Sequence, residues 1–239
     1  MTLKIIEPVE QVKSQGYAIL PKVLTPAVAS DWIARIEEAL KQSEASIRGS
    51  AGKVTAARNI LTELPDANSV WQGPSTQTFL ADILGSEFIC VRALYFDKHP
   101  ENSWSLPWHK DMTIAVADNR RGSDHFSKPT HKNGVPHVEA STAILNNMLT
   151  LRFHLDDVRE ENGPLEVIPE SHLDGKTNSS KHTSSTFVFC DAGDVLAMRP
   201  LLSHKSSGSA PGTRLHRRVL HFEFSGNPEL PDDYQWFYR

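Results

Sequence analysis

FICVRALYF, residues 88–96, is the first of a series of short runs that are rich in β-branched and aromatic residues. Such runs, when Gly, Pro, Asn, Asp and Ser separate them, are typical of β-strands. The later runs are TIAVA (113–117), MLTLRFHL (148–155), PLEVIP (164–169), TFVFC (186–190), DVLAM (194–198) and RVLHFEF (218–224). Because no helical pattern alternates with them, they predict a double-layer jelly roll or cupin-like barrel rather than a doubly wound sheet.

The residues before this series have a helical pattern instead. Thr25 and Pro26 are suited to the N-cap and the first position of a helix, and apolar residues follow at helical spacing. We expect this helix to end near Gln42. A second, shorter helix is predicted over 76–84, with Ser75 as its N-cap. The fold class is therefore mainly β with N-terminal helices.

The length of 239 residues predicts a single domain, 1–239. Within it we expect a mixed helical lead-in (1–85), a jelly-roll core (86–225) and a C-terminal tail (226–239). An insert at 117–137 interrupts the core; it is polar, rich in turn residues and carries three histidines. Loops of this length usually act as lids or binding loops. We therefore expect 118–137 to be mobile without substrate and to close over the site when substrate binds.

Composition excludes several classes of partner. The net charge is −4 and no basic stripe is interleaved with aromatic residues, so a nucleic acid is not expected. No apolar run approaches the length that a bilayer requires, and the N-terminal residues lack the features of a signal peptide. Cys90 and Cys190 stand in apolar, strand-like contexts, which predicts buried free thiols and a cytoplasmic location. The oligomeric state is not predicted.

His109 and Asp111, in PWHKDMTI, are candidates for a metal site. Two side chains at i and i+2 on a strand point to the same face, so both can reach one ion. An isolated His-x-Asp pair is weak evidence, because it also suits the solvent face of a strand. The chain contains a second example, His154 and Asp156, which a functional interpretation must distinguish from the first.

A third ligand favours the first pair. A non-haem Fe(II) site with two histidines and one carboxylate needs a second histidine from elsewhere in the fold. His204, at the end of a strand-like run, is the best candidate, with an exposed loop histidine as the alternative. Early and late strands of a jelly roll are neighbours, so the long separation between His109 and His204 suits a shared site. The shorter separation between His154 and His204 suits it less well but is not excluded.

Arg217 and Arg218 open the last predicted strand. An arginine inside a barrel is unfavourable unless a carboxylate meets its donors, as a dicarboxylic co-substrate would. The alternative is a pair of surface arginines at a strand end. A strand points only one of the two inward, and simple hydrophobic alternation favours Arg218.

Together these motifs resemble the phytanoyl-CoA dioxygenase family of Fe(II)/2-oxoglutarate-dependent oxygenases. The likeness extends through QGYAILPKVLT, RNILTELP, FDKHPENSWSLPWHKDMTIAV and LRFHLDDVREENGPLEVIPESH. It implies a double-stranded β-helix in which His109, Asp111 and His204 bind Fe(II). It also implies that 2-oxoglutarate and dioxygen are co-substrates, and that Ser206 and one of the two arginines hold the far carboxylate of 2-oxoglutarate.

The resemblance also bears on individual residues. It favours Arg217 over Arg218 as the arginine that binds 2-oxoglutarate, with Phe222 and Phe224 then packing outward against the N-terminal helices. His172 is a scaffold residue by resemblance, and Glu170 stands where the family usually has a glycine.

The function that the resemblance implies is oxidation, by default hydroxylation, of an unactivated C–H bond in a small-molecule metabolite. 2-Oxoglutarate is decarboxylated to succinate in the same reaction. Dealkylation, desaturation and ring formation are further outcomes of the same chemistry. The alternatives are a small-molecule or carbohydrate binding module without catalysis and a cupin-type metal enzyme that does not use 2-oxoglutarate. The substrate is not predicted, although Lys98 and Lys110 could meet an acidic one.

Overall fold

The computed structural model describes residues 7–41, 43, 46–48, 54–99, 101–177 and 184–238. The described helices are α1 (Pro8–Gln15), α2 (Pro26–Leu40), α3 (Ile60–Glu63), α4 (Pro74–Leu84) and α5 (Thr142–Asn146). Three 3-10 turns accompany them, at Pro65–Trp71, Glu160–Asn162 and Ser171–Asp174. Four of the five described helices precede the first long strand, in agreement with the expected N-terminal helices.

The strands form three antiparallel sheets. The large sheet has the order β1 (Tyr17–Leu20), β12 (Val195–Met198), β9 (Met148–His154), β14 (Arg217–Ser225), β4 (Ile89–Lys98), β3 (Val54–Ala57) and β2 (Ser46–Arg48). The small sheet has the order β11 (Thr186–Val188), β10 (Leu165–Val167), β13 (His204–Ser206) and β5 (Leu106–His109). A third sheet consists of β6 (Thr113–Ala115), β8 (Val135–Ala140) and β7 (Phe126–Lys132). Three short strands of the large sheet therefore come from the lead-in.

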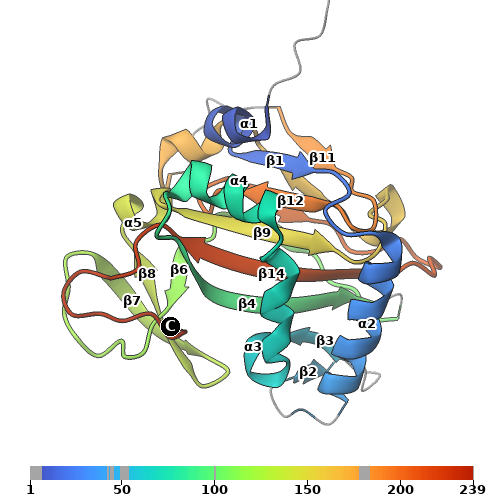
Figure 1. Ribbon diagram of the computed structural model, residues 1–239, viewed down its shortest axis with the longest axis horizontal. Coiled ribbons are helices and arrows are strands. Elements are labelled where there is room, and N and C mark those ends of the chain that lie inside the picture. Colours follow the sequence, from blue (N-terminus) through green and yellow to red (C-terminus); the bar gives the residue numbers. More distant parts are fainter. Residues whose placement is uncertain are drawn as a thin grey trace, which may run out of the picture.

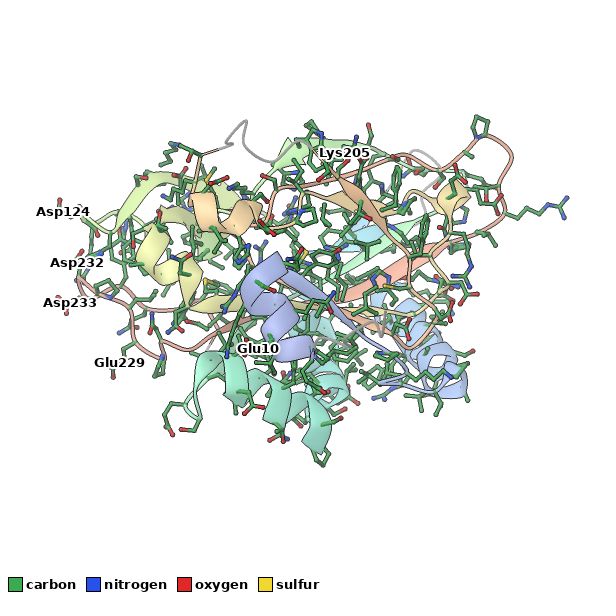
Figure 2. All side chains as sticks on the ribbon, turned by 90° about the horizontal axis from the view of Figure 1, so that it is seen from above. Glu10, Asp124, Lys205, Glu229, Asp232 and Asp233 are labelled. Carbon is green, nitrogen blue, oxygen red and sulfur yellow. The ribbon has the colours of Figure 1, made fainter. Side chains whose placement is uncertain are left out.

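Helices α2 and α4 cover one face of the large sheet, as Figure 1 shows. Figure 2 shows the layers edge on, with α4 on one side of the molecule and Lys205 of β13 on the other. Leu220, Phe222 and Phe224 of β14 belong to the core cluster that contains the buried residues of α2 and α4. Alternate residues of β14 therefore face inward, toward the small sheet.

The predicted helix boundaries hold only in part. The Thr25 hydroxyl accepts a hydrogen bond from the Val28 amide (3.3 Å) and caps α2, as expected. The helix ends at Leu40, and Gln42, its expected end, lies outside the described residues. The prediction for the second helix was wrong at its start, because α4 begins at Pro74 and places Ser75 inside the helix. Proline at the first position, where an amide proton has no partner, explains the earlier start.

The insert is also ordered differently from the prediction of a long loop. Most of it forms a hairpin in which β7 and β8 pair with each other and β8 pairs with β6 (Figure 1). Asn133 and Gly134 connect the two strands with positive φ angles of 49° and 75°, the conformation that an Asn-Gly hairpin turn prefers. Most side chains of β7 are exposed and polar, and this concealed the strand pattern. That the hairpin closes over substrate stays a prediction.

Both cysteines are free, as predicted, but only Cys190 is buried and Cys90 is partly buried. Burial raises the pKa of the Cys90 thiol and of the Cys190 thiol to about 12, so neither is an ionised nucleophile at neutral pH.

Glu170 has a left-handed backbone, with φ 67°, at the position where the family usually has glycine. The left-handed conformation destabilises a residue with a Cβ by about 1–2 kcal/mol. Glycine avoids this strain, but its larger loss of entropy on folding offsets roughly half of the gain. We expect Glu170→Gly to raise the free energy of unfolding by about 0.5–1 kcal/mol in denaturant titrations. Glu10→Gly, inside α1, is the matched control and should lose about 1 kcal/mol. Equal losses in both variants would contradict the prediction.

Candidate active site

His109, Asp111 and His204 converge between the two sheets. His109 is the last residue of β5 and pairs directly with His204, the first residue of β13. Asp111 follows the end of β5, where its amide donates to the Pro200 carbonyl (2.8 Å). The three side chains each offer a ligand atom, and these atoms all lie within 4.8 Å of one another. Among the described residues, these three form the one group of histidine, cysteine and acidic side chains that are close enough together to hold a metal ion.

Both imidazoles are held in the tautomer that a metal ligand requires. His109 Nδ1 lies 2.7 Å from the Pro107 carbonyl, and His204 Nδ1 lies 2.9 Å from the Leu202 carbonyl. A carbonyl only accepts, so each Nδ1 carries the proton and each Nε2 keeps a free lone pair. Asp111 lies 4.0 Å from Nε2 of His109 and 3.7 Å from Nε2 of His204. Two imidazole lone pairs and one carboxylate fit an Fe(II) ion.

Electrostatics supports the neutral state of the buried histidine. Burial lowers the pKa of His204 to about 4, in spite of the opposing effect of Asp111. His204 is 3% exposed, whereas His109 and Asp111 are half-buried and form the accessible side of the site.

The second His-x-Asp pair lies elsewhere. Asp156 accepts two hydrogen bonds from the Arg218 guanidinium, at 2.7 and 2.8 Å, and is thereby engaged. His154 is buried in β9, and burial, followed by Arg152 and Arg217, lowers its pKa well below the ordinary value. It is not brought together with His109 or His204.

Arg217 and Arg218 point in opposite directions. Arg217 is 3% exposed and lines a cavity of about 100 Å³ together with His109, Asp111, His204 and Ser206. Its Nε and Nη1 atoms are buried and have no partner among the described residues. Arg218, in contrast, is ion-paired with Asp156 and also with Glu37 of α2 (3.0 Å).

Lys98 is a further residue of this cavity region, and the sequence had suggested only that it could meet an acidic substrate. It stands opposite Arg217 in the large sheet and is 0% exposed. Its Nζ donates to the Ser206 hydroxyl (3.1 Å) and to the Ser207 carbonyl. Burial, followed by Arg217 and Arg152, lowers the pKa of Lys98 to about 6. The signal in the sequence was its spacing, since Phe96 and Lys98 alternate with outward-facing residues of the same strand.

Three buried basic side chains, those of Lys98, Arg152 and Arg217, thus lie at one end of the barrel interior. None of them is ion-paired with a carboxylate in the part of the chain that the structure describes. Arg152 donates to Nδ1 of His221 (3.0 Å), a neutral partner. An unpaired buried charge is destabilising, so the buried guanidinium groups of Arg152 and Arg217 favour an anion at this end of the cavity. Lys110 has a structural role instead, because it donates to the Ser171 and Gly175 carbonyls (2.7 Å each).

A model of the phytanoyl-CoA dioxygenase family matches residues 12–214 of the sequence. The chain belongs to the phytanoyl-CoA dioxygenase family. Comparison of its sequence with curated proteins finds no match.

Solved structures of similar fold agree with this family. The non-haem α-ketoglutarate-dependent carbocyclase SnoK of nogalamycin biosynthesis is 19% identical, with a TM-score of 0.67 over 94% of this chain and 84% of its own. The epimerase SnoN, in complex with Fe³⁺, α-ketoglutarate and nogalamycin RO, is 16% identical, with a TM-score of 0.67 over 95% and 90%. EctD from S. alaskensis, in its apo form, is 15% identical, with a TM-score of 0.67 over 91% and 75%. The predicted fold class, a double-stranded β-helix with N-terminal helices, is confirmed.

Family membership also decides the class of activity. This phytanoyl-CoA dioxygenase family protein is an Fe(II)- and 2-oxoglutarate-dependent dioxygenase, and dioxygen is its second co-substrate. The alternatives of a binding module and of a cupin-type enzyme without 2-oxoglutarate are thereby excluded. Among the described helices, none has the length and apolar character that crossing a membrane requires.

Proposed function

We propose that the protein hydroxylates an unactivated C–H bond of a small-molecule metabolite and converts 2-oxoglutarate to succinate and carbon dioxide. The observation that carries this proposal is the buried, unpartnered guanidinium of Arg217 in the same cavity as the three ligand side chains. We also propose that residues 1–239 act as one domain, and that two free thiols reflect a cytoplasmic location.

We assign His109, Asp111 and His204 to the Fe(II) ion. Three protein ligands leave three coordination positions for co-substrates. When bound, the ion supplies the oxidising chemistry with dioxygen and 2-oxoglutarate. The protein contributes the fixed tautomers of both histidines, because the Pro107 and Leu202 carbonyls hold the Nδ1 protons away from the metal.

We assign Arg217, Ser206 and Lys98 to the far carboxylate of 2-oxoglutarate. An arginine fork binds a carboxylate through two parallel hydrogen bonds. The Ser206 hydroxyl accepts a hydrogen bond from Lys98, so its own proton is free to be donated to a ligand. The assignment gives the excess positive charge of this end of the cavity an anion to compensate it.

The depressed pKa of Lys98 predicts that 2-oxoglutarate binding takes up a proton. At pH 7.5 an amine with a pKa of about 6 is mostly neutral, and a carboxylate beside it raises that pKa. We expect about one proton to be taken up per 2-oxoglutarate, so that affinity falls as the pH rises above about 6. Calorimetry in buffers of different ionisation enthalpy measures the uptake. Lys98→Met is the control, and equal uptake by both proteins would assign the proton to another group.

The test of the proposed function is 2-oxoglutarate turnover across a panel of small metabolites, with succinate and product both measured. A true substrate should stimulate succinate formation and yield a product one oxygen atom heavier. SnoN and SnoK are described as an epimerase and a carbocyclase, so product mass is the decisive readout. A coupled product of unchanged mass, or one lighter by two hydrogen atoms, would overturn hydroxylation.

A further inference from the structure

A second cavity, of about 140 Å³, lies beside the one that holds Arg217. Phe96, Asp111 and His221 line both cavities, so the second begins where the assigned metal site ends. Its volume is close to that of a cavity that admits benzene, roughly 150 Å³. With 2-oxoglutarate assigned to the first cavity, the second is the place for the molecule that is oxidised.

Four ionisable side chains other than Asp111 and His221 line this second cavity: Arg58, Arg92, Lys132 and Glu223. Arg92 and Glu223 form an ion pair (3.2 Å), and both are largely buried. Glu223 also lies 3.5 Å from Nε2 of His221. His221 Nδ1 accepts from Arg152, so Nε2 carries the proton and faces the carboxylate. Glu223, the acidic side chain among these four, is therefore already paired with Arg92 and His221.

Arg58 and Lys132 remain without an acidic partner in the described part of the chain. For Arg58, burial and the nearby Arg92 both lower the pKa, and nothing opposes them. Lys132 donates to the Thr113 hydroxyl (2.8 Å), a neutral acceptor. Burial, Arg92 and Arg58 lower the pKa of Lys132, while Glu223 and Asp111 act in the opposite direction. The charge of Asp111 is assigned to the metal, so the second cavity has an excess of positive charge.

The remaining walls are mostly apolar. Leu94, Ile114, Leu145 and Met148 line the same cavity. A ligand that matches this lining has an anionic group at one end and an apolar body at the other. Arg58 comes from the turn before α3 and Lys132 from the end of β7, so two segments distant in sequence present their cations to one space.

We propose that the substrate is a small acid whose carboxylate or phosphate group is held by Arg58 and Lys132. The inference rests on the proposed function, since it places the oxidised molecule in the cavity that shares Asp111 with the co-substrate. Arginine supplies a fork for two anionic oxygens and lysine a single strong donor. The apolar walls then hold the carbon skeleton.

Pairs of probes that differ only in charge test this inference. Short branched and cyclic carboxylic acids are each compared with their primary amides, and phosphate monoesters with the parent alcohols. Binding is measured by calorimetry on protein saturated with Mn(II) and 2-oxoglutarate without oxygen, so that Arg217 is already occupied. We expect at least one charged probe to bind about tenfold or more tightly than its neutral partner. The series that binds distinguishes a carboxylate from a phosphate ligand.

Variants of single residues then identify which side chains cause the preference for the charged probe. Arg58→Gln and Lys132→Gln should each remove most of the preference for the charged probe. Lys128→Gln should keep it, because Lys128 is on the same strand but is exposed and paired with Glu139 (2.7 Å). Arg58→Lys, which retains the charge, should keep part of it and controls for misfolding.

Two results would overturn the inference: no charged probe binds better than its neutral partner, or the preference survives in both glutamine variants. Failure of the proposed function is a separate result, in which turnover with 2-oxoglutarate gives a coupled product that has not gained an oxygen atom.

Discussion

Replacement of His109, Asp111 or His204 by alanine is expected to abolish iron binding and succinate formation. In our assignment each of them is one of three protein ligands, and loss of one leaves too few to hold Fe(II) in the required geometry. The three side chains lie at the ends of two short strands and in the link between β5 and β6, so the fold should persist. Iron per chain, succinate formed per minute and circular dichroism are measured on the same samples.

The control for this prediction is His154→Ala, which removes the histidine of the other His-x-Asp pair. We expect this variant to retain bound iron, because His154 lies away from the three ligand atoms. Loss of iron in His154→Ala together with its retention in His109→Ala would show that the metal site is wrongly placed.

Arg217→Ala is expected to weaken 2-oxoglutarate binding at least about thirtyfold. The variant leaves a carboxylate without its fork of donors in a buried site, a loss on the order of 2–5 kcal/mol. The measurement is the dissociation constant of 2-oxoglutarate for the Mn(II)-loaded protein without oxygen.

Arg218→Ala is the matched control, since it removes the neighbouring arginine of the same strand. Arg218 binds Asp156 and Glu37 rather than the cavity, so the variant should keep its affinity for 2-oxoglutarate and lose about 1–3 kcal/mol of stability. A large loss of affinity only in Arg218→Ala would show that the assignment is wrong by one residue. Little loss in either variant would remove both arginines from the site.

The sequence predicted the strands well where two kinds of information agreed. Runs such as MLTLRFHL combine β-branched or aromatic composition with flanking turn residues, and β9 covers most of that run. Prediction failed for β7, whose strand character depends on pairing with β8 rather than on buried side chains. The Asn-Gly turn was a usable local signal, because its conformation matches the twist of a hairpin.

The orientation of β14 shows the limit of alternation alone. Its apolar residues Leu220, Phe222 and Phe224 face the helices. Arg217, His221 and Glu223, on the other face, line the two cavities between the sheets. Hydrophobic alternation by itself assigns the apolar set to the interior of the barrel. Both faces of β14 are buried, one against the helices and the other toward the cavities. Alternation therefore separates the two faces but does not tell which of them holds the active site.

The burial of Lys98 and the cavity position of Arg58 could not be predicted from the sequence for a different reason, although Lys98 was a candidate for meeting an acidic substrate. A lysine or arginine is usually exposed, and only the paired strands or the shared cavity show that these two are enclosed. Their significance depends on what is absent nearby, a carboxylate partner among the described residues. Such an absence is visible only in three dimensions.

The central claim is that one Fe(II) ion, held by His109, Asp111 and His204, binds 2-oxoglutarate anchored by Arg217. Anaerobic titration of the Fe(II)-loaded protein with 2-oxoglutarate tests it most directly, because chelation of the metal by the keto-acid produces a weak visible charge-transfer band. The account predicts about one iron per chain and a band that saturates at about one 2-oxoglutarate per iron. The band should be absent in Asp111→Ala and should need far more 2-oxoglutarate in Arg217→Ala. Absence of the band in wild-type protein that binds both iron and 2-oxoglutarate would contradict it.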